Sequence, residues 1–297
     1  MKYAEGLSTG VRFGLLLDMP CSVELSPVTV AALCSRGRGL GVDAVLRVTV
    51  AGSAREAGIL DELPEGVTVD DWYIDQRDAD GALEAFDGNG LRMLSHYLWA
   101  AGLERRREFV AGSRTDAHSV QMHSTDAASA DISVVTAGIS VRGRGAARIA
   151  GREFDAVRLD ISGACCLAGV SPTLSAEDLP ELDMKAPIVF DDGVSGESAM
   201  VAFASLLVDD AVVMRVHRDG ELPSSDLAAV AVACAARPIS QGTHVATTVR
   251  AAGGTVTVGL ADTTCRVRGS TSLTAHGDIP VAWLRRPYPM WTSVSQR

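Results

Sequence analysis

Two short helices, each preceded by a tight polar turn, constrain what this chain can fold into. The first is predicted over residues 91–101, where Leu91, Leu94 and Leu98 share one apolar face at helical spacing. The second is predicted over residues 226–236, which are almost wholly Ala, Val, Leu and Cys and therefore require burial on all sides. The helices lie close to half of the 297-residue chain apart. The sequence therefore indicates two structurally similar halves that each offer one helix N-terminus.

Short β-type segments surround these helices and make the chain a mixture of α and β structure. They are rich in Val, Ile and Leu, are bounded by Gly, Asp or Pro, and cover residues 11–18, 44–50, 133–141 and 210–216. A further helix is predicted over residues 27–36. The polar stretch 113–129 is interpreted as the boundary between the halves, with a long surface loop inside one domain as the alternative. We therefore predict an α+β fold with two domains, residues 1–125 and 126–279.

Composition and charge exclude several classes of function. The formal net charge is −10 and no run of Lys or Arg occurs, which argues against nucleic acid as a partner because neutralising phosphates needs clustered cations. No apolar segment approaches the roughly 18–20 residues of a membrane span. The N-terminal segment, Met-Lys-Tyr-Ala-Glu-Gly, has no signal-peptide pattern. We expect a cytoplasmic protein with neither a nucleic acid nor a membrane as its partner.

The cysteines indicate neither a metal site nor a disulfide framework. No CxxC pair occurs, and no nearby histidine has metal-ligand spacing, so we expect no metal and no other cofactor. The adjacent Cys165 and Cys166 are interpreted as small buried side chains, with a redox pair as the alternative. Reduced thiols fit a cytoplasmic protein. The six cysteines are Cys21, Cys34, Cys165, Cys166, Cys234 and Cys265.

Residues 78–93 resemble an active-site segment whose catalytic residue has been replaced. They read Asp-Ala-Asp-Gly-Ala-Leu-Glu-Ala-Phe-Asp-Gly-Asn-Gly-Leu-Arg-Met. Diaminopimelate epimerases have a similar segment, Asn-Ala-Asp-Gly-Ser-Glu followed by Cys-Gly-Asn-Gly-x-Arg-Cys. Asp87 stands where that family has one of its two catalytic thiols, Asp78 replaces a substrate-binding Asn, and Met93 replaces the other Cys of the motif. The matching residues are Gly88, Asn89, Gly90 and Arg92.

Further matches extend the resemblance over most of the chain. Residues 33–46 are close to the family's Cys-Asp-Arg-x-x-Gly-Ile-Gly-Ala-Asp-Gly. Residues 6–18 resemble the entry strand, although the family's substrate-binding Asn falls at Thr9 or Val11, and residues 255–284 resemble the closing strands. Four residues are interpreted as shaping a turn rather than as catalytic: Arg36, Gly39, Gly41 and Asp43.

The position of the family's second catalytic Cys is also changed. It falls at or beside Ser225, where Pro-Ser-Ser-Asp replaces Leu-Ala-Cys-Gly. In the preceding motif Arg218 keeps an Arg that contacts the substrate in the family, whereas His217 replaces a Glu. The resemblance implies two similar domains, each a mixed, mostly antiparallel sheet wrapped around a central buried helix, with residues 280–297 completing the first. It also implies a homodimer, but not thiol-based epimerisation.

The two helix starts are predicted to bind a substrate carboxylate. Unpaired N–H groups and the positive end of the helix dipole favour an anion there. Gly88 and Gly90 allow the backbone to come close to a ligand, and Arg218 adds a charge-assisted contact. The predicted substrate-binding residues are Asp78, Gly88, Asn89, Gly90, Arg218, Ser224, Ser225 and Asp226.

Without the two thiols, the proton carrier must be a carboxylate or a histidine. The predicted catalytic residues are Asp87, His217 and Glu221, with Glu84 as a further candidate. Histidine titrates near neutral pH, which suits a general base. An aspartate at a helix start is a weak base and suits a C–H bond that is already activated.

Each candidate is weighed against an ordinary structural role. Asp87, and either Ser225 or Asp226, stand where helix N-caps are found. Asp78 is alternatively a turn residue, and His217 a hydrogen-bonded histidine of the core or surface. Four further polar side chains are expected to be exposed to solvent: Asp80, Glu84, His118 and His123.

The predicted function is a cofactor-independent isomerase that moves a proton and a double bond in a small unsaturated or imino carboxylic acid. The family's phenazine-pathway relatives offer a precedent, since they shift a double bond with carboxylates and no thiols. The Ala, Gly, Val and Arg content suggests a GC-rich, actinomycete-like source and a secondary-metabolite pathway, most specifically a 4-alkylproline precursor of an antibiotic. The alternatives are an amino-acid epimerase with non-thiol bases and a catalytically inactive carboxylate-binding accessory protein.

Overall fold

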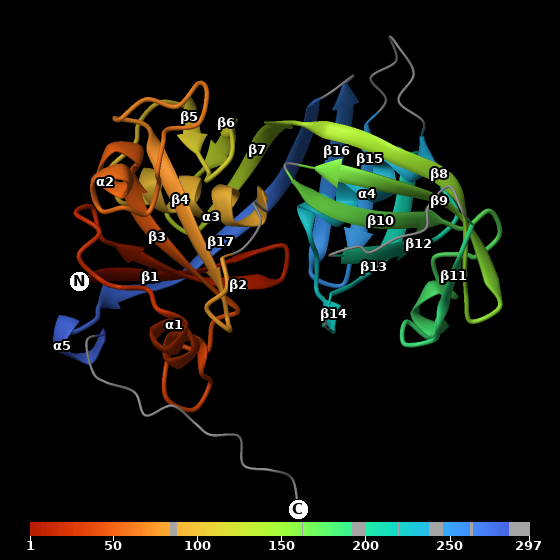
Figure 1. Ribbon diagram of the computed structural model, residues 1–297, viewed down its shortest axis with the longest axis horizontal. Coiled ribbons are helices and arrows are strands. Elements are labelled where there is room, and N and C mark those ends of the chain that lie inside the picture. The colour runs from red at the N-terminus through yellow and green to blue at the C-terminus, as the bar shows by residue number, and fades with distance from the viewer. Residues whose placement is uncertain are drawn as a thin grey trace, which may run out of the picture.

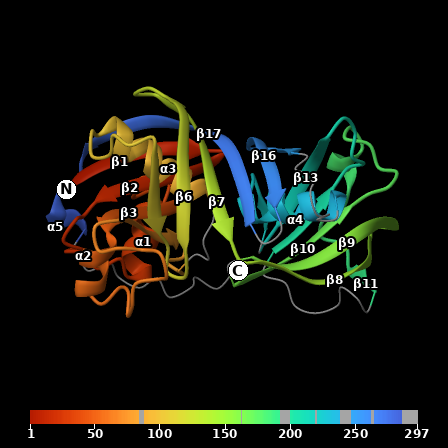
Figure 2. The same cartoon turned by 90° about the horizontal axis from the view of Figure 1, so that it is seen from above.

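The protein is a mostly-sheet, barrel-like molecule in which two groups of strands lie side by side. The computed structural model describes residues 1–83, 88–161, 163–191, 200–218, 220–237, 246–261 and 264–284. This part of the chain contains 17 strands and five α-helices. Strands β7 (Ser129–Ala137) and β17 (Thr264–Asp278) run between the two groups (Figures 1 and 2).

The remaining elements follow one another along the chain, first in one group and then in the other. The first group contains β1 (Lys2–Ser8), β2 (Val11–Leu17), α1 (Pro27–Cys34), β3 (Ala44–Val50), α2 (Ala51–Glu56), β4 (Trp72–Asp78), α3 (Gly88–Ala100), β5 (Glu108–Gly112) and β6 (Ala117–Thr125). The second contains β8 (Ile139–Ile149), β9 (Arg152–Ile161), β10 (Ala164–Val170), a 3-10 turn (Leu179–Glu181), β11 (Ile188–Phe190), β12 (Met200–Ala204), β13 (Ala211–His217), β14 (Glu221–Leu222), α4 (Asp226–Ala236), β15 (Thr247–Ala251) and β16 (Gly254–Ala261). Helix α5 (Val281–Leu284) follows β17.

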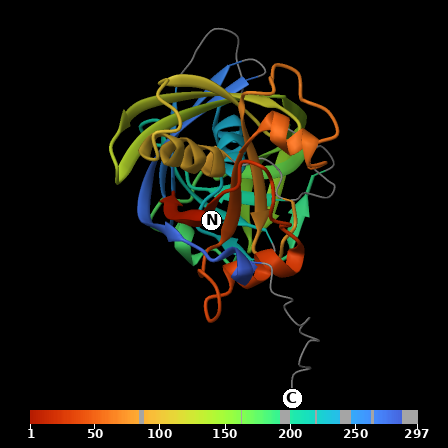
Figure 3. The same cartoon turned by 90° about the vertical axis from the view of Figure 1, so that its left-hand side faces the viewer.

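The first group of strands closes on itself around α3. Going round the ring, β1 pairs with β2, β2 with β3, β3 with β4, β4 with β5, β5 with β6, β6 with β7, β7 with β17, and β17 with β1. The β2–β3 and β4–β5 pairs are parallel and the others are antiparallel. Helix α3 contacts seven of these strands. The view along the long axis shows α3 inside this ring (Figure 3).

The second group repeats the same order of pairings. Antiparallel β9–β10 is followed by parallel β10–β12, antiparallel β12–β13, parallel β13–β15, and antiparallel β15–β16 and β16–β17. Helix α4 contacts β9, β10, β12, β13, β15, β16 and β17. Its Ala- and Val-rich sequence explains this placement, because small apolar side chains on every face let strands approach from several directions.

The C-terminal end of the described chain returns to the first group. Ile279 and Leu284 are buried in a cluster with Leu16, Val23 and Val30. The N-terminal ammonium group donates to the Ile279 carbonyl at 3.0 Å, which ties the two ends of the described chain together. The remaining residues of the predicted completing segment, 285–297, lie outside the described residues.

The predicted helices and strands agree closely with the observed ones, but residues 113–129 do not form a linker. They contain β6, which pairs with β5 and β7. The chain instead crosses from the first group to the second at Gly138, which has a φ of 82° and separates β7 from β8 inside the single strand predicted over residues 133–141. Frequent Ser, Asp and His residues give this stretch the composition of a loop, but on the strand more exposed side chains alternate with the buried His118, Val120 and Met122.

The prediction that His118 is exposed is wrong. The alternation of β6 turns it inward, and its ring nitrogens lie 3.1 Å from Thr136 Oγ1 and 2.9 Å from Ser113 Oγ. Burial lowers the pKa of His118 to about 4. His123, on the other face, is exposed as predicted, and its Nε2 lies 2.8 Å from Ser133 Oγ.

Within the described residues, no helix has the length and apolar character needed to span a bilayer. The six cysteines are free thiols, and of the adjacent pair Cys166 is buried and Cys165 half-buried.

Candidate functional site between the two helix starts

Helix α3 begins where the two groups of strands meet, and its first residues are buried. A Cβ atom on Gly88 would meet Asp226 Oδ2, and one on Gly90 would meet Gln76 Oε1. A larger residue at either position would therefore displace one of these side chains, and glycine lets both of them lie against α3.

Helix α4 begins with an ordinary N-cap. Ser225 has an extended backbone, with φ −154° and ψ 136°, and its hydroxyl accepts a hydrogen bond from the Ala228 N–H at 3.3 Å. This hydrogen bond confirms the capping role weighed from the sequence for Ser225, which the resemblance places at or beside the family's second thiol. Asp226 follows as the first helical residue and is buried.

A buried ion pair joins the two helix starts. The Arg92 guanidinium donates to both carboxylate oxygens of Asp226, through Nη1 to Oδ2 and through Nη2 to Oδ1 at 2.9 Å. The two side chains are 0% and 4% exposed and 134 residues apart in sequence. A two-pronged, desolvated pair of this kind fixes the geometry of both helix starts.

The Asn89 side chain is held by the structure around it. Its Oδ1 accepts hydrogen bonds from Arg92 Nη2 at 2.6 Å, from Ser8 Oγ at 3.2 Å, and from the Thr9 hydroxyl. Thr9 has a left-handed φ of 42° and stands near the position of a family substrate-binding Asn. Asn89 therefore links α3 to the turn between β1 and β2.

A cavity of about 450 Å³ opens beside these helix starts, with residues of both groups of strands in its wall. Of the predicted site residues it brings together Asp78, Asn89, Arg218, Glu221 and Ser224. Arg218 Nη2 donates to Asp78 Oδ2 at 2.9 Å, with side chains 29% and 27% exposed. This ion pair crosses the cavity from one group of strands to the other, so Asp78 orients Arg218.

Glu221 and His217 face each other across the β13–β14 hairpin. Glu221 lines the cavity and accepts from Arg215 Nε at 2.7 Å and Nη2 at 2.9 Å. The bonds from Arg215 hold the pKa of Glu221 below its usual range. His217 is half-buried and is not one of the residues that line the cavity.

Two predicted proton carriers, Asp87 and Glu84, lie outside the described residues. Asp80 is exposed as predicted and accepts from the Ala82 N–H at 2.8 Å in a turn.

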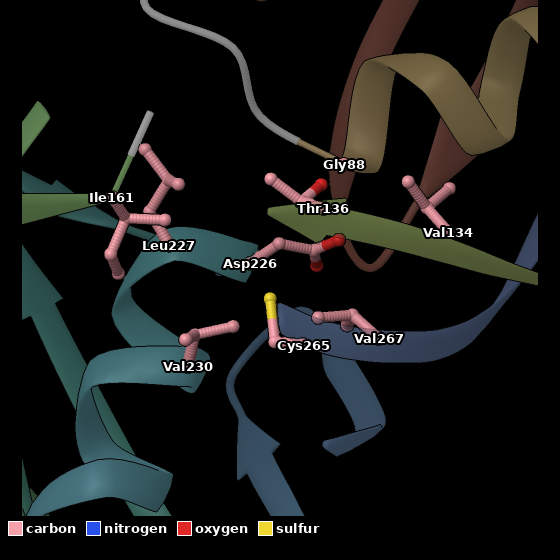
Figure 4. Close-up of a pocket in the computed structure, with 9 residues that line it drawn as sticks. All are labelled: Gly88, Val134, Thr136, Ile161, Asp226, Leu227, Val230, Cys265 and Val267. Atoms are coloured by element: carbon pink, nitrogen blue, oxygen red, sulfur yellow. The ribbon is translucent and has the colours of Figure 1, made fainter. Parts of the chain in front are cut away.

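A second, water-sized cavity of about 10 Å³ lies directly at the junction. Asp226 and Cys265 meet there beside Gly88 and Thr136 (Figure 4). Burial raises the pKa of the Cys265 thiol to about 12, with contributions from Cys234 and the Asp226 carboxylate. Cys265 therefore stays protonated at neutral pH, and this thiol cannot replace the family's reactive ones.

The thiols elsewhere in the described chain do not supply the missing chemistry. Burial raises the pKa of both Cys34 and Cys234 to about 12. Among the described residues, no cysteine lines the larger cavity, and no group of three His, Cys, Asp or Glu side chains has the geometry of a metal site.

Three contributors to the site were not expected from the sequence. Arg36 and Asp43, interpreted there as parts of a turn, line the larger cavity together with Gln76. Arg92 matched a family motif, but its partner Asp226 is on the other helix, and no local spacing predicts that pairing. For Arg36 and Asp43 the sequence signal was their charge within the glycine-rich segment 36–43, whereas Gln76 stood out by no such signal.

Comparison with known proteins assigns the family. The chain is 42% identical to the diaminopimelate epimerase of Mycolicibacterium vanbaalenii over 95% of its own length and 98% of that protein. It is also 42% identical to the diaminopimelate epimerase of Mycobacterium tuberculosis, over the same shares of the two chains. The chain belongs to the diaminopimelate epimerase family. No family model matches it.

Solved structures agree on the fold. The PhzF-family phenazine biosynthesis protein of Bacillus anthracis superposes with a TM-score of 0.62 at 11% identity, covering 94% of this chain and 99% of that one. A probable proline racemase of Agrobacterium radiobacter gives 0.60 at 11% identity, over 94% and 93% of the two chains. Methylitaconate-delta-isomerase gives 0.55 at 11% identity, over 99% of both chains. The relatives at 42% identity are diaminopimelate epimerases, and the solved structures, all at 11% identity, support the shared fold.

Proposed function

We propose that this family member is a cofactor-independent isomerase that moves a proton and a double bond in a small unsaturated or imino carboxylic acid. One observation carries the proposal: among the described residues, the cavity wall holds two arginines and three carboxylates but no thiol. Such a wall suits an anionic ligand and proton transfer by carboxylates. It does not suit the thiol chemistry for which the family motif was built.

Arg218 is the proposed anchor for the substrate carboxylate. It lines the cavity, and the bond from its Nη2 to Asp78 fixes one edge of the guanidinium. Arginine presents several donors in one plane that match the two oxygens of a carboxylate, so a cavity-lining guanidinium oriented by Asp78 suits a carboxylate ligand. Arg36 in the same wall adds positive charge.

The acids near this anchor suit a substrate whose C–H bond is already activated. Carboxylates are weak bases, and the low pKa of Glu221 keeps it ionised at neutral pH. The α-hydrogen of a plain amino acid is too weakly acidic for such a base, whereas a hydrogen conjugated to an imine, enamine or double bond is not. We propose Asp87 as one acid/base group and Glu221 or His217 as the other.

The finer assignments belong to the same proposal. The substrate is proposed to be an intermediate of a secondary-metabolite pathway, most specifically a 4-alkylproline precursor of an antibiotic, converted by a cytoplasmic homodimer. We also propose that the two groups of strands, predicted from the sequence as residues 1–125 completed by 280–297 and residues 126–279, act as two domains that meet at Gly138 rather than at residue 125. Their closure over the ligand would exclude water from the cavity.

Two alternative functions each have an observation in their favour. The relatives at 42% identity are diaminopimelate epimerases, which favours an amino-acid epimerase with non-thiol bases. The buried Arg92–Asp226 pair occupies the junction of the helix starts, which favours a carboxylate-binding accessory protein without catalysis.

Proton exchange in deuterated water tests all three functions. The purified protein is incubated with conjugated pyrroline and dienamine carboxylates and with diaminopimelate, and NMR and mass spectrometry follow label and double-bond position. We expect deuterium to enter together with a moved double bond, and this exchange to be lost in Asp87→Asn and strongly reduced in Arg218→Met. Arg148→Met, on an exposed pair with Glu153, is the matched control and is expected to behave as wild type.

The other outcomes separate the alternatives. Label at a single stereocentre without a moved double bond would favour the epimerase. Binding without any label would favour the accessory protein. Unchanged exchange in Asp87→Asn would remove that residue from the mechanism.

A further inference from the structure

The junction of the two helix starts contains the groups that a carboxylate ligand would need, and a carboxylate of the chain itself is already there. Asp226 is the first residue of α4, where an acidic side chain is favoured by the helix dipole. Its Oδ2 also lies against Gly88, the first residue of α3, at the place where a Cβ would be. Figure 4 shows this side chain lying between the start of α3 and the body of α4.

The contacts of Asp226 exceed those of a helix-capping charge. An acid in the first turn of a helix interacts with its own helix and needs no distant cation. Asp226 receives two hydrogen bonds from Arg92, which lies on the other helix, 134 residues away. The carboxylate is 4% exposed and the guanidinium 0%. Two helix N-termini and a guanidinium thus converge on one buried anion.

We infer that Asp226 is a built-in counter-anion that fills the carboxylate position between α3 and α4 and so determines which ligands the protein accepts. A second carboxylate beside Asp226 would meet a like charge where little solvent screens it. The ligand carboxylate is therefore directed to Arg218 in the neighbouring cavity. The part of this inference that concerns the ligand rests on the proposed function, whereas the filled anion position does not.

The position of Asp226 in the family motif supports this role. It stands where the family motif has the Gly that follows the second catalytic Cys, and glycine leaves that position open. Replacement by Asp adds both the carboxylate and the volume that fill it. In this chain the position therefore holds a carboxylate that is paired with Arg92 and lies against Gly88.

Restoring the glycine tests the inference with formate, the smallest carboxylate, as the probe. Asp226→Gly removes the internal anion and leaves a space of carboxylate size beside Arg92. We expect its Tm to fall below that of wild type and to rise again by about 4 °C when formate is about 100-fold above its Kd. Wild type is expected to respond to formate no more than to sodium chloride of equal ionic strength.

Two matched variants separate the effect of the Asp226 charge from the effect of the space that its side chain fills. Asp226→Asn leaves Arg92 without a counter-charge but still fills the position, so formate is expected to have little effect on it. In the double variant Arg92→Met/Asp226→Gly the space remains without the cation, and the formate response is expected to disappear. Benzoate, which is too large for the space, is not expected to replace formate in Asp226→Gly.

Several results would overturn the inference. It fails if Asp226→Gly responds to formate no more than wild type, or if Asp226→Asn responds equally. If Asp226→Gly is insoluble without formate, the yield of soluble protein with and without formate decides, and no gain with formate counts against the inference. None of these readouts needs turnover, so their failure leaves the isomerase proposal intact, and an inactive isomerase leaves these readouts interpretable.

Discussion

The two central helices occupy equivalent places in the repeated strand order, yet they are chemically very different. Helix α3 buries Asn89, Arg92, Ser95 and His96 along its length. Helix α4 buries a single charged side chain, Asp226, and is otherwise built from Ala, Val, Leu and Cys. The two groups therefore repeat the order of strand pairings, but their helices do not carry the same kinds of side chain. One helix carries the polar groups, and the other is an apolar body with a Ser cap and one acid at its start.

This difference explains how a two-thiol site could be lost without loss of the fold. A pair of thiols needs a reactive group at each helix start. Here the described start of α4 offers Ser225, whose hydroxyl caps the helix, and Asp226, which neutralises Arg92. Both residues therefore have structural partners close to the position where the family motif has its second catalytic Cys.

The largest effect is expected when the Arg92–Asp226 ion pair between the two helices is removed. Arg92→Met keeps much of the side-chain volume but leaves the Asp226 carboxylate buried without its cation, so we expect a loss of about 3–5 kcal/mol in the free energy of unfolding, measured in urea. Arg268→Met, which removes an exposed pair with Asp131, is the control and is expected to cost about 0–1 kcal/mol. Equal costs in the two variants would show that burial of the Arg92 pair has no special weight.

A smaller, pH-dependent effect is expected from two buried histidines in the first group of strands. Burial lowers the pKa of His118 to about 4 from a usual 6.5, and His96 in α3 is shifted in the same direction by burial. Because the unfolded chain binds these protons first, stability is complete above about pH 6.5 and falls as the pH drops towards 4, by about 3 kcal/mol for His118 alone.

Urea unfolding between pH 7 and 4 measures this slope. His118→Gln is expected to lose His118's share of it, while His276→Gln, at an exposed position, is expected to keep the wild-type slope. An unchanged slope in His118→Gln would mean that the pKa of this histidine is the same in the folded and unfolded chain.

The smallest predicted effect concerns the cap of α4. Ser225→Ala removes the hydroxyl that accepts from the Ala228 N–H, and we expect a cost of about 1 kcal/mol. Ser225→Thr, which keeps the hydroxyl, is expected to retain most of the stability. If Ser225→Ala instead abolished proton exchange in deuterated water at unchanged stability, Ser225 would have a chemical role that its capping geometry does not indicate.

Local sequence patterns predicted much of the fold. The apolar spacing of Leu91, Leu94 and Leu98 and the uniform apolar character of residues 226–236 were enough to place both helices, which the structure confirms as α3 and α4. The stretch 113–129 was misread because composition alone cannot distinguish a polar loop from a strand with one buried face. Within that strand, His118 is satisfied by Thr136 from β7, a contact that sequence spacing does not reveal.

For the site, the sequence determined which groups are available: no thiol at either motif position, and Asp and Arg residues next to glycines at the helix starts. Only the tertiary structure decided which of them meet. It paired Arg92 with Asp226 across 134 residues and brought Arg218 to Asp78 across 140. Residue identity and local spacing follow from covalent order, whereas these pairings depend on how two sheets close around two helices. The sequence therefore determines which charged residues are present at the junction, and the fold determines which of them form ion pairs.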